Sequence, residues 1–206
     1  MHVLISAGPT REKIDPVRFI SNRSSGRMGY ALAAAAVRAG HRVTLVSGPV
    51  VLPCPEGVER VSVESAAEMA AAIRRCAADA DVIIMAAAVA DYRPAAPEPR
   101  KIKKMPGELT LKLERTEDIL AALGQCKRPG QILVGFAAET DDLERNALDK
   151  LRRKNLDWIA ANRVEDGFGT TDNALVVFHR NGGRYVLENS PKEILAARLL
   201  RLILPD

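Results

Sequence analysis

Short apolar segments alternate with alanine-rich segments along the first half of the chain. Residues 2–6 (HVLIS), 42–47 (RVTLVS) and 81–85 (DVIIM) have the length and β-branched character of buried strands. The segments 26–40 and 65–78 are rich in alanine and free of proline, as helices are, and Gly40 supplies a stop signal for the first of them. This β-α-β-α-β order predicts a parallel sheet with right-handed crossovers and helices on both faces.

The second half of the chain continues the sheet and ends it differently. Residues 108–114 alternate apolar with polar positions, which predicts a strand with one wet face, and Thr116 is placed to cap a short helix that ends at Leu123. Further predicted elements are strands at 131–136 and 156–161, a helix at 142–154, an antiparallel hairpin formed by 174–179 and 184–187 around Asn-Gly-Gly, and a helix at 191–203. The predicted fold class is α/β, a Rossmann-like and mostly parallel sheet with helices on both faces and a C-terminal antiparallel hairpin.

The segment after the third strand has a different character. Residues 86–104 carry Pro94, Pro97 and Pro99 and then a basic cluster. They predict an extended surface loop, and long loops of this kind usually have a function.

Composition and charge limit the classes of function. The chain has 206 residues, of which 47% are apolar and 27% charged, and no linker, repeat or low-complexity segment divides it. We therefore expect one domain over residues 1–206. The net charge of +4 is small for this length. It favours a local cationic patch for a phosphorylated ligand and gives no reason to expect a nucleic-acid partner.

Cysteine usage and hydropathy bear on the compartment. Cys54, Cys76 and Cys126 are odd in number, widely separated and without a CxxC pair, which argues against a disulfide framework and a structural zinc site. A reducing compartment is therefore expected. The sequence shows no signal peptide before the first strand and no apolar run of the roughly 18 residues that a membrane span needs. These features predict a cytoplasmic protein with no membrane partner.

Glycines between the first strand and the first helix suggest a dinucleotide site, but their spacing differs from the usual one. Gly8 is separated from Gly26 and Gly29 by a long insertion, and the second strand ends in Ser47-Gly48-Pro49 without an acidic residue for a ribose diol. An NAD(P)-dependent reductase on a Rossmann-like fold is therefore the alternative function. A non-catalytic nucleotide-binding regulator is a third, and it would bind a nucleotide without consuming it.

The insertion itself is rich in groups that bind anions. Guanidinium groups, hydroxyls and a helix N-terminus together favour phosphate or carboxylate. The residues that carry these groups are Arg11, Arg18, Asn22, Arg23, Ser24, Ser25 and Arg27. Their spacing is equally typical of a solvated loop whose serine and asparagine side chains cap the helix.

Two groups of lysines are further candidates. Within Arg100–Lys104, an extended chain sends Lys101 and Lys103 to one side and Lys104 to the other. Lys150 and Lys154 share one helical face and could meet the same polyanion. The first group is also typical of a basic strand edge and the second of a solvated helix face. The histidines have no nearby nucleophile or metal partner in the sequence and receive no role.

Five strings occur in order and span most of the chain: AGPTREKIDPVRFISNRSSGRMGYALA, AAAVADYRP, KIKK, GFAAET and KNLDWIAAN. Together they resemble bacterial phosphopantothenate-cysteine ligases, also called phosphopantothenoylcysteine synthetases. Members of that family are commonly the C-terminal half of a bifunctional coenzyme A biosynthesis protein whose N-terminal half is a flavin-dependent phosphopantothenoylcysteine decarboxylase. The sequence lacks that half, so an excised domain or a stand-alone ligase is expected, fused to or working with such a decarboxylase.

The resemblance implies a reaction. Family members look like Rossmann-like homodimers that use CTP and Mg²⁺ to join L-cysteine to (R)-4'-phosphopantothenate. The carboxylate attacks the α-phosphate and gives an acyl-cytidylate, from which the cysteine amine displaces CMP. The expected products are 4'-phosphopantothenoyl-cysteine, CMP and pyrophosphate. A carboxylate does not accept an amine near neutral pH, whereas a mixed anhydride does when water is excluded.

The resemblance also assigns residues. Asn22 matches the asparagine of the family's ISNxSSG motif, which is tied to handling the acyl-cytidylate, and Arg18 matches the arginine before it. Lys101 and Lys104 match the outer lysines of KxKK, and Lys101 is expected to contact the triphosphate. The positions that match nucleotide contacts are Ala86, Ala87, Ala88, Asp91, Phe136, Lys150, Lys154 and the segment Glu117, Asp118, Ile119 and Leu120.

Some positions depart from the family pattern or stay open. The family member used for comparison has proline where this chain has Glu117, which matters little if backbone atoms make the contact. Arg23 and Arg27 receive no individual role. Asp91 is a candidate carboxylate on the metal side, and the metal ligands are otherwise unassigned.

Overall fold

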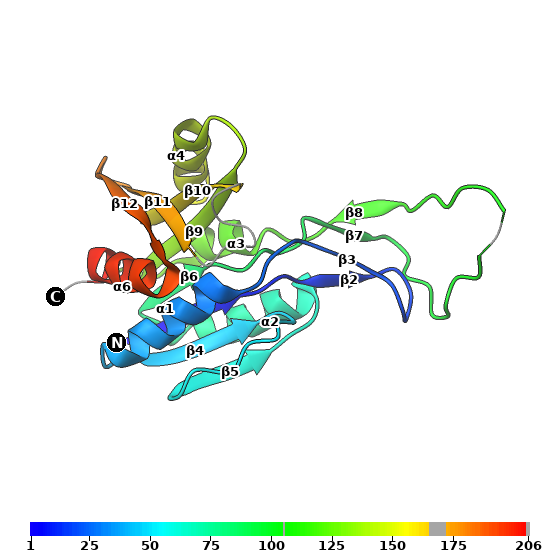
Figure 1. The fold of residues 1–206 in the computed structure, drawn as a ribbon, viewed down its shortest axis with the longest axis horizontal. Coiled ribbons are helices and arrows are strands. Elements are labelled where there is room, and N and C mark those ends of the chain that lie inside the picture. Colours follow the sequence, from blue (N-terminus) through cyan, green and yellow to red (C-terminus); the bar gives the residue numbers. More distant parts are fainter. Residues whose placement is uncertain (105, 165–171, 205–206) are drawn as a thin grey trace.

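An eight-stranded, mostly parallel sheet forms the centre of the molecule. The computed structural model describes residues 1–104, 106–164 and 172–204. The strands of the sheet are β1 (His2–Ala7), β4 (Arg42–Ser47), β5 (Val58–Ser62), β6 (Val82–Met85), β9 (Ile132–Glu139), β10 (Trp158–Arg163), β11 (Asp172–His179) and β12 (Arg184–Pro191). They lie in the order β12-β11-β10-β9-β6-β1-β4-β5. All pairs between β10 and β5 are parallel, while β11 and β12 join antiparallel, which confirms the predicted sheet (Figure 1).

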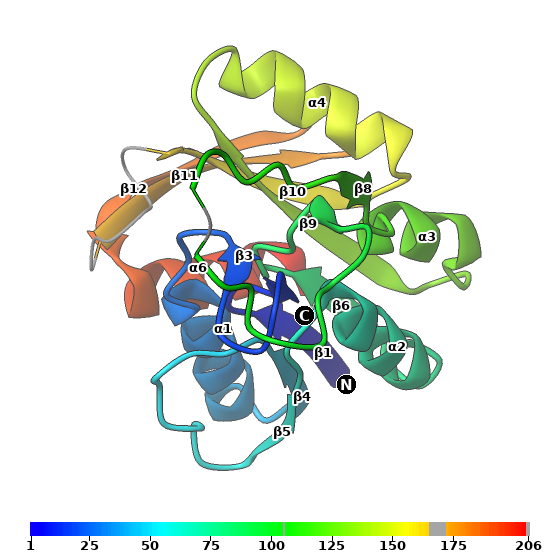
Figure 2. The same cartoon turned by 90° about the vertical axis from the view of Figure 1, so that its right-hand side faces the viewer.

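Helices cover both faces of the sheet, as predicted. On one face, α1 (Arg27–Arg38) and α6 (Lys192–Ile203) pack against alternate strand residues such as Ile5. The helices of the other face are α2 (Ala66–Ala77), α3 (Ile119–Cys126) and α4 (Leu143–Arg153), which pack against the remaining strand residues, such as Leu4 (Figure 2). Period-2 alternation therefore divides the core into two layers. No helix within the described residues is long and apolar enough to cross a membrane.

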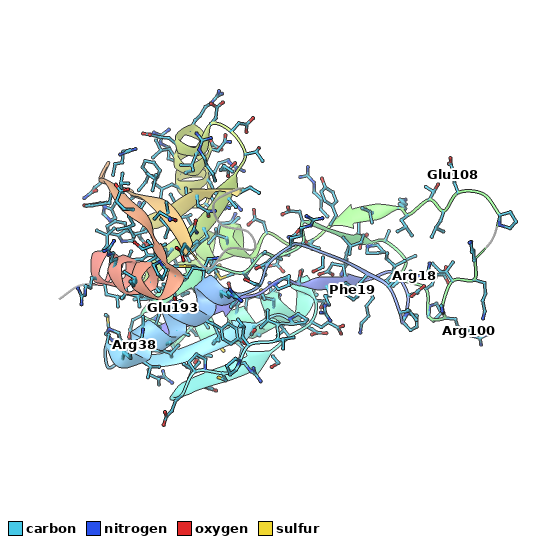
Figure 3. All side chains as sticks on the ribbon, in the orientation of Figure 1. Arg18, Phe19, Arg38, Arg100, Glu108 and Glu193 are labelled. Carbon is cyan, nitrogen blue, oxygen red and sulfur yellow. The ribbon has the colours of Figure 1, made fainter. Side chains whose placement is uncertain are left out.

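A narrow protrusion extends from one edge of this body. It consists of two hairpins, β2 (Arg11–Lys13) with β3 (Phe19–Ser21) and β7 (Tyr92–Pro94) with β8 (Leu113–Arg115), and of the segments that connect their strands. We call residues 11–21 and 92–115 the arm. Figure 3 labels Arg18, Phe19, Arg100 and Glu108 along it, away from the sheet. The hairpins are tied together by the amide of Glu98, which donates to the carbonyl of Ile14 at 2.9 Å.

The predicted strand at 108–114 and the predicted cap at Thr116 were wrong in detail. Only the end of that segment forms β8, because its partner β7 ends at Pro94, which has no N–H to continue a ladder. The Thr116 hydroxyl donates to the carbonyl of Ala90 at 2.6 Å. Asp118 caps α3 in its place, since its carboxylate accepts the amide of Ala121 at 3.0 Å.

Several strands have no counterpart among the predictions. β5 follows β4 in parallel at the edge of the sheet, and its Val58 and Val61 are only partly buried, so the apolar pattern is weak. The short strands of the arm also lack an apolar stripe. One of them, β7, lies inside the loop predicted for residues 86–104. Its partner β8 begins about twenty residues later in the chain, so no local pattern links the two. β10 begins two residues later than the predicted strand at 156–161.

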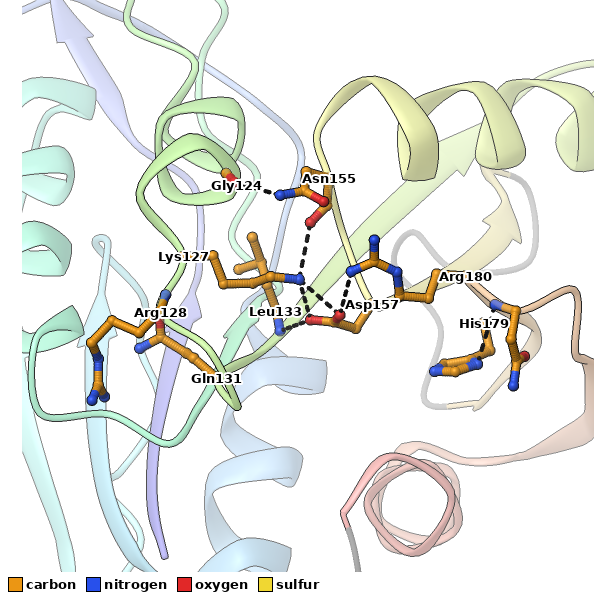
Figure 4. Close-up of polar contacts among 10 residues, drawn as sticks. Gly124, Lys127, Arg128, Gln131, Leu133, Asn155, Asp157, His179 and Arg180 are labelled. Atoms are coloured by element: carbon orange, nitrogen blue, oxygen red, sulfur yellow. Dashed lines mark hydrogen bonds and ion pairs between the residues drawn. The ribbon is translucent and has the colours of Figure 1, made fainter.

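A charged tie joins the amino-terminal edge of the parallel sheet to the C-terminal hairpin (Figure 4). The Asp157 carboxylate accepts from Lys127 Nζ at 2.7 Å and from Arg180 at 3.2 Å. It also accepts the Leu133 amide at 2.8 Å. Burial alone would raise the pKa of Asp157, but the Lys127 and Leu133 hydrogen bonds hold that pKa below its ordinary value. The tie anchors α3, β9 and the turn of the β11–β12 hairpin to one carboxylate.

The first helix approaches the first strand unusually closely at Gly29. A Cβ atom at Gly29 would lie 2.5 Å from Ala7 Cβ and 3.1 Å from both Ala7 Cα and the Ser6 carbonyl oxygen. Glycine therefore allows the first turn of α1 to rest directly on the carboxyl end of β1. This contact fixes where the helix N-terminus lies.

We expect Gly29→Ala to destabilise the fold. Alanine gains up to about 1 kcal/mol of helix propensity over glycine. Overpacking costs about 1–3 kcal/mol, so we expect a net loss of up to about 2 kcal/mol in the free energy of unfolding. Urea denaturation measures it. Ala7→Gly removes the opposing Cβ, so the double variant should recover part of the loss, and strictly additive effects would contradict the proposed clash.

Candidate functional site

A cavity of about 330 Å³ lies where the carboxyl ends of the parallel strands meet. This edge is the usual ligand site of open α/β sheets, and the volume is within the range of small-molecule sites. Its wall combines the start of α1, the loop after β6, the start of α3, one face of α4 and the ends of β9 and β10. The lining residues are Ser24, Ser25, Gly26, Arg27, Met28, Gly29, Met85, Ala86, Ala87, Ala88, Val89, Asp91, Thr116, Glu117, Asp118, Ile119, Leu120, Phe136, Ala137, Ala138, Lys150, Lys154, Asn162, Asn173 and Lys192.

The structure brings most of the predicted nucleotide positions together in this cavity. They come from four separate stretches of the sequence and share one wall. They are Ala86, Ala87, Ala88, Asp91, Glu117, Asp118, Ile119, Leu120, Phe136, Lys150 and Lys154. The remaining predicted site residues, Arg18, Asn22, Lys101 and Lys104, are not among the residues that line it.

The start of α1 presents backbone donors to the cavity. Gly26 is the N-cap residue, with φ of 75°, and within the described residues the helix start has no side-chain cap hydrogen bond. Ser24 and Ser25 add hydroxyl groups beside it. Uncapped amides and the helix dipole favour an anion at this point. The part of the predicted anion site that reaches the cavity is therefore Ser24, Ser25 and Arg27.

Asn22 does not cap this helix, so the capping interpretation was wrong for it. Its side-chain amide donates to the carbonyls of Ala88 at 3.2 Å and Val89 at 3.0 Å. These two carbonyls belong to the loop after β6, whose Ala86–Val89 stretch lines the cavity. Asn22 is exposed and lies immediately behind that wall. The contact couples the base of the arm to the cavity.

Backbone amides of the loop after β6 form hydrogen bonds with β1 and with the residue that follows β1. The Ala87 amide donates to Ser6 Oγ at 3.1 Å, and the Ala88 amide donates to the carbonyl of Gly8 at 2.9 Å. Because their side chains are small, these alanines let a ligand approach the backbone closely. Asp91, at the end of the loop, places a carboxylate on the cavity wall.

Lys150 and Lys154 supply cations from α4. Lys150 Nζ donates to the Phe136 carbonyl at 2.7 Å. Burial and then the nearby Lys154 lower the pKa of Lys150, against the opposing effect of Glu139, Asp118 and Asp91. Lys154 pairs with Asp118 at 2.7 Å, so its ammonium group is held against the start of α3. The two lysines share a face that lines the cavity, and the interpretation as a solvated face was wrong.

Arg18 and the lysine motif lie together on the arm (Figure 3). The buried Asp15 carboxylate accepts the amides of Val17 and Arg18 at 2.8 Å and of Ile102 at 3.2 Å. Arg18 pairs with Asp15 at 2.9 Å and donates to the Ile102 carbonyl at 2.6 Å. Ile102 is therefore fixed to the tip of the β2–β3 hairpin. Lys101 and Lys104 flank it, are exposed, and lie away from the cavity of their own chain.

Lys192, Asn162 and Asn173 are cavity residues that the sequence did not single out. β12 runs in the same direction as β10, so it ends at the same edge and α6 begins beside the cavity. The signal available in the sequence was Lys192 directly after Pro191, at the predicted start of a helix. It could have been recognised only once the direction of the hairpin strands was known.

Magnesium was expected from the resemblance. No group of three or more His, Cys, Asp or Glu side chains that could hold a metal occurs among the described residues. Three carboxylates line the cavity, and of these Glu117 pairs with Arg74 and Asp118 with Lys154, which leaves Asp91 as the candidate for a metal. Mg²⁺ takes few protein ligands and keeps waters and substrate phosphates, so a single carboxylate at this place fits an ion that arrives with a polyphosphate.

Comparisons with known proteins agree on one family. Residues 1–205 match the family described as the DNA/pantothenate metabolism flavoprotein C-terminal domain. The chain is 49% identical over 206 residues to the coenzyme A biosynthesis bifunctional protein CoaBC of Bacillus subtilis, covering 98% of this chain and 50% of that protein. It is also 49% identical to the protein of that name from Escherichia coli, over 97% and 50%. The chain spans about half the length of these curated relatives.

A solved structure supports the same assignment. The crystal structure of the C-terminal domain of a coenzyme A biosynthesis bifunctional protein CoaBC is 44% identical in sequence to this chain. It superposes with a TM-score of 0.85 and covers 98% of this chain and 93% of that one. The likeness therefore extends over the sheet, the helices and the arm together.

The lowered pKa of Lys150 predicts a dependence of stability on pH. Below its ordinary pKa of about 10.4, the folded state releases the Lys150 proton before the unfolded state does. The free energy of unfolding should therefore rise with pH in the alkaline range relative to that of Lys150→Met. Urea denaturation of both proteins between about pH 7.5 and 10.5 measures the difference, because the effect extends up to the ordinary pKa of lysine. A constant difference across this range would contradict the electrostatic description of Lys150.

Proposed function

Because the chain belongs to the DNA/pantothenate metabolism flavoprotein C-terminal domain family, we propose that it is a phosphopantothenate-cysteine ligase of coenzyme A biosynthesis. It joins L-cysteine to 4'-phosphopantothenate with CTP and gives 4'-phosphopantothenoyl-cysteine, CMP and pyrophosphate. The observation that carries the proposal is that eleven of the positions matched to nucleotide contacts of the ligases line one cavity at the carboxyl edge, while Lys101 does not.

The cavity suits a nucleoside triphosphate in its charge and shape. Lys150 and Lys154 supply cations on the α4 side, and Phe136 supplies an apolar surface next to them. The uncapped amides of α1, with Ser24 and Ser25, supply donors on the other side. Phosphoryl and nucleotidyl chemistry depends chiefly on such positioning and charge stabilisation. The residues of this cavity therefore suit the transfer of a nucleotidyl group, the first step of the ligase reaction, better than they suit hydride transfer.

The reaction has two steps. In the first, a carboxylate oxygen of phosphopantothenate bonds to the α-phosphorus, and the bond to the bridging oxygen breaks so that pyrophosphate leaves with the electron pair. In the second, the cysteine amine bonds to the acyl carbon, loses a proton, and CMP leaves with the anhydride oxygen. Asp91 would hold Mg²⁺, which supplies charge neutralisation for the phosphates when bound.

Asn22 acts on the second step. Its side-chain amide already contacts the carbonyls of Ala88 and Val89, so it lies where the loop after β6 meets the base of the arm. When the acyl-cytidylate is bound, one of the two amide N–H groups leaves its backbone carbonyl and donates to the intermediate, which orients it for the amine. Arg18 acts indirectly within its own chain. Its guanidinium holds the backbone of Ile102, which lies between Lys101 and Lys104 in the sequence.

The protein acts as a homodimer in this proposal. The arm extends away from the body of the molecule (Figure 1). Lys101 and Lys104 belong to the arm and do not line the cavity of their own chain, so a second copy is needed to bring such lysines to a nucleotide. The arm also exposes large apolar side chains that a partner would cover. They are Val17, Phe19, Tyr92, Leu109, Leu111 and Leu113. A flavin-dependent phosphopantothenoylcysteine decarboxylase, fused or separate, would take the product onward.

The first test measures pyrophosphate release from CTP and from ATP, with phosphopantothenate present and cysteine added or withheld. We expect release from CTP that requires phosphopantothenate, followed by CMP and amide once cysteine is added. Thermal shifts with CTP and with NADPH run in parallel, because a ligand of the folded state raises its stability. No release from either nucleotide, with a shift only for NADPH, would replace the ligase by the reductase.

Two variants separate the steps. We expect Asn22→Asp to keep pyrophosphate release and to lower amide formation by about 10²–10³-fold, the cost of one lost transition-state donor. Lys101→Gln should slow pyrophosphate release itself by a similar factor. Asn181→Asp and Arg38→Gln, at exposed positions outside the arm and the cavity, are controls and should behave as the wild type. Full turnover in Asn22→Asp or Lys101→Gln would remove the assigned role from that residue.

A further inference from the structure

Lys192 is a buried cation on the cavity wall for which neither the sequence nor the matched positions provide a role. It is the first residue of α6, and only 4% of its surface is exposed. It lines the cavity from the face of the sheet that α1 and α6 cover, whereas Lys150 and Lys154 come from α4 on the other face. The cavity is therefore bounded by ammonium groups from both layers of the fold.

A second cation, Arg27, acts on Lys192. Burial and the positive charge of Arg27 lower the pKa of Lys192, while Asp172 and Glu193 oppose them. Arg27 lines the same cavity at the first position of α1. A buried cation near a second cation costs free energy that an apolar side chain of similar volume would avoid. An anion between them would reverse the sign of this interaction.

Backbone and amide donors converge on the same place. The uncapped first turn of α1 begins at Arg27, and α6 begins at Lys192 without a side-chain cap. Asn173 is buried and lies opposite Ser190 in the β11–β12 ladder. Ser190 precedes Lys192 by two residues. Asn162, at the end of β10, is also buried and lines the cavity. Such a set of cations, amides and helix termini is suited to two adjacent phosphate groups and exceeds the need of one.

We propose that Lys192 binds the β- and γ-phosphates of the nucleoside triphosphate, together with the start of α1, and stabilises pyrophosphate as it leaves. The inference rests on the proposed function. When the carboxylate oxygen bonds to the α-phosphorus, the electron pair of the broken bond passes to the bridging oxygen, so negative charge grows on the pyrophosphate. Lys192 meets this charge from one side, and Lys150 and Lys154 hold the remainder of the nucleotide from the other.

The test compares ligands that differ only in their terminal phosphates. Binding of CTP, CMP and inorganic pyrophosphate is measured by calorimetry for the wild type, Lys192→Met, Lys192→Arg and Arg201→Met. We expect Lys192→Met to bind CTP and pyrophosphate about 10- to 100-fold more weakly, the usual cost of one charge-assisted hydrogen bond, and CMP within about twofold of wild type. Lys192→Arg should keep most of the affinity for CTP. Arg201→Met, on the exposed face of the same helix, should match the wild type.

The outcomes separate this inference from the proposed function. Unchanged CTP affinity in a Lys192→Met protein, beside a wild type that releases pyrophosphate, overturns the inference alone. An equal loss for CTP and CMP, or a loss of binding caused by misfolding in both substitutions at 192, assigns Lys192 a structural role and also overturns it. A wild type that binds pyrophosphate but releases none from CTP overturns the proposed function. In that case the selective loss in Lys192→Met still supports a pyrophosphate-binding lysine.

Discussion

Parallel pairing sends the carboxyl ends of β1, β6, β9 and β10 to one edge of the sheet, and the site depends on this constraint. The antiparallel hairpin extends it, because β12 returns in the direction of β10 and delivers the start of α6 to the same edge. Segments from both halves of the chain thereby form one cavity. The chemistry can then be changed by loop and helix-start residues without altering the strands that support them.

The cavity concentrates positive charge that the fold does not neutralise in full. Lys154 is paired with Asp118, and burial and neighbouring cations lower the pKa of Lys150 and the pKa of Lys192. Stability comes from the two apolar layers on either side of the sheet, which contain no such conflict. Burial and like charge therefore disfavour the charged forms of Lys150 and Lys192 at this edge, and in the proposed function a polyanionic ligand offsets this effect.

The sequence predicts those parts of the fold that carry an apolar pattern. The buried strands and alanine-rich helices follow from period-2 and period-3.6 spacing, and the nucleotide positions follow from matched strings. The arm was not predicted as two hairpins, because its short strands have no buried face and β7 pairs with a distant segment. Lys192 was missed because its place depends on the direction of β12. The proposed contact of Lys101 with a nucleotide requires a second copy of the chain, and the periodicity of one chain carries no signal for it.

Asp15 and Arg18 fix the backbone of Ile102. The position of the motif lysines beside it therefore does not depend on the length of the loop. An insertion or deletion between this anchor and β8 would change the size of the loop without moving Lys101. A change within the hairpin turn that carries Asp15 would move the anchor itself. Over evolutionary time, length variation should therefore accumulate on the β8 side of Ile102, while the β2–β3 turn keeps a constant length.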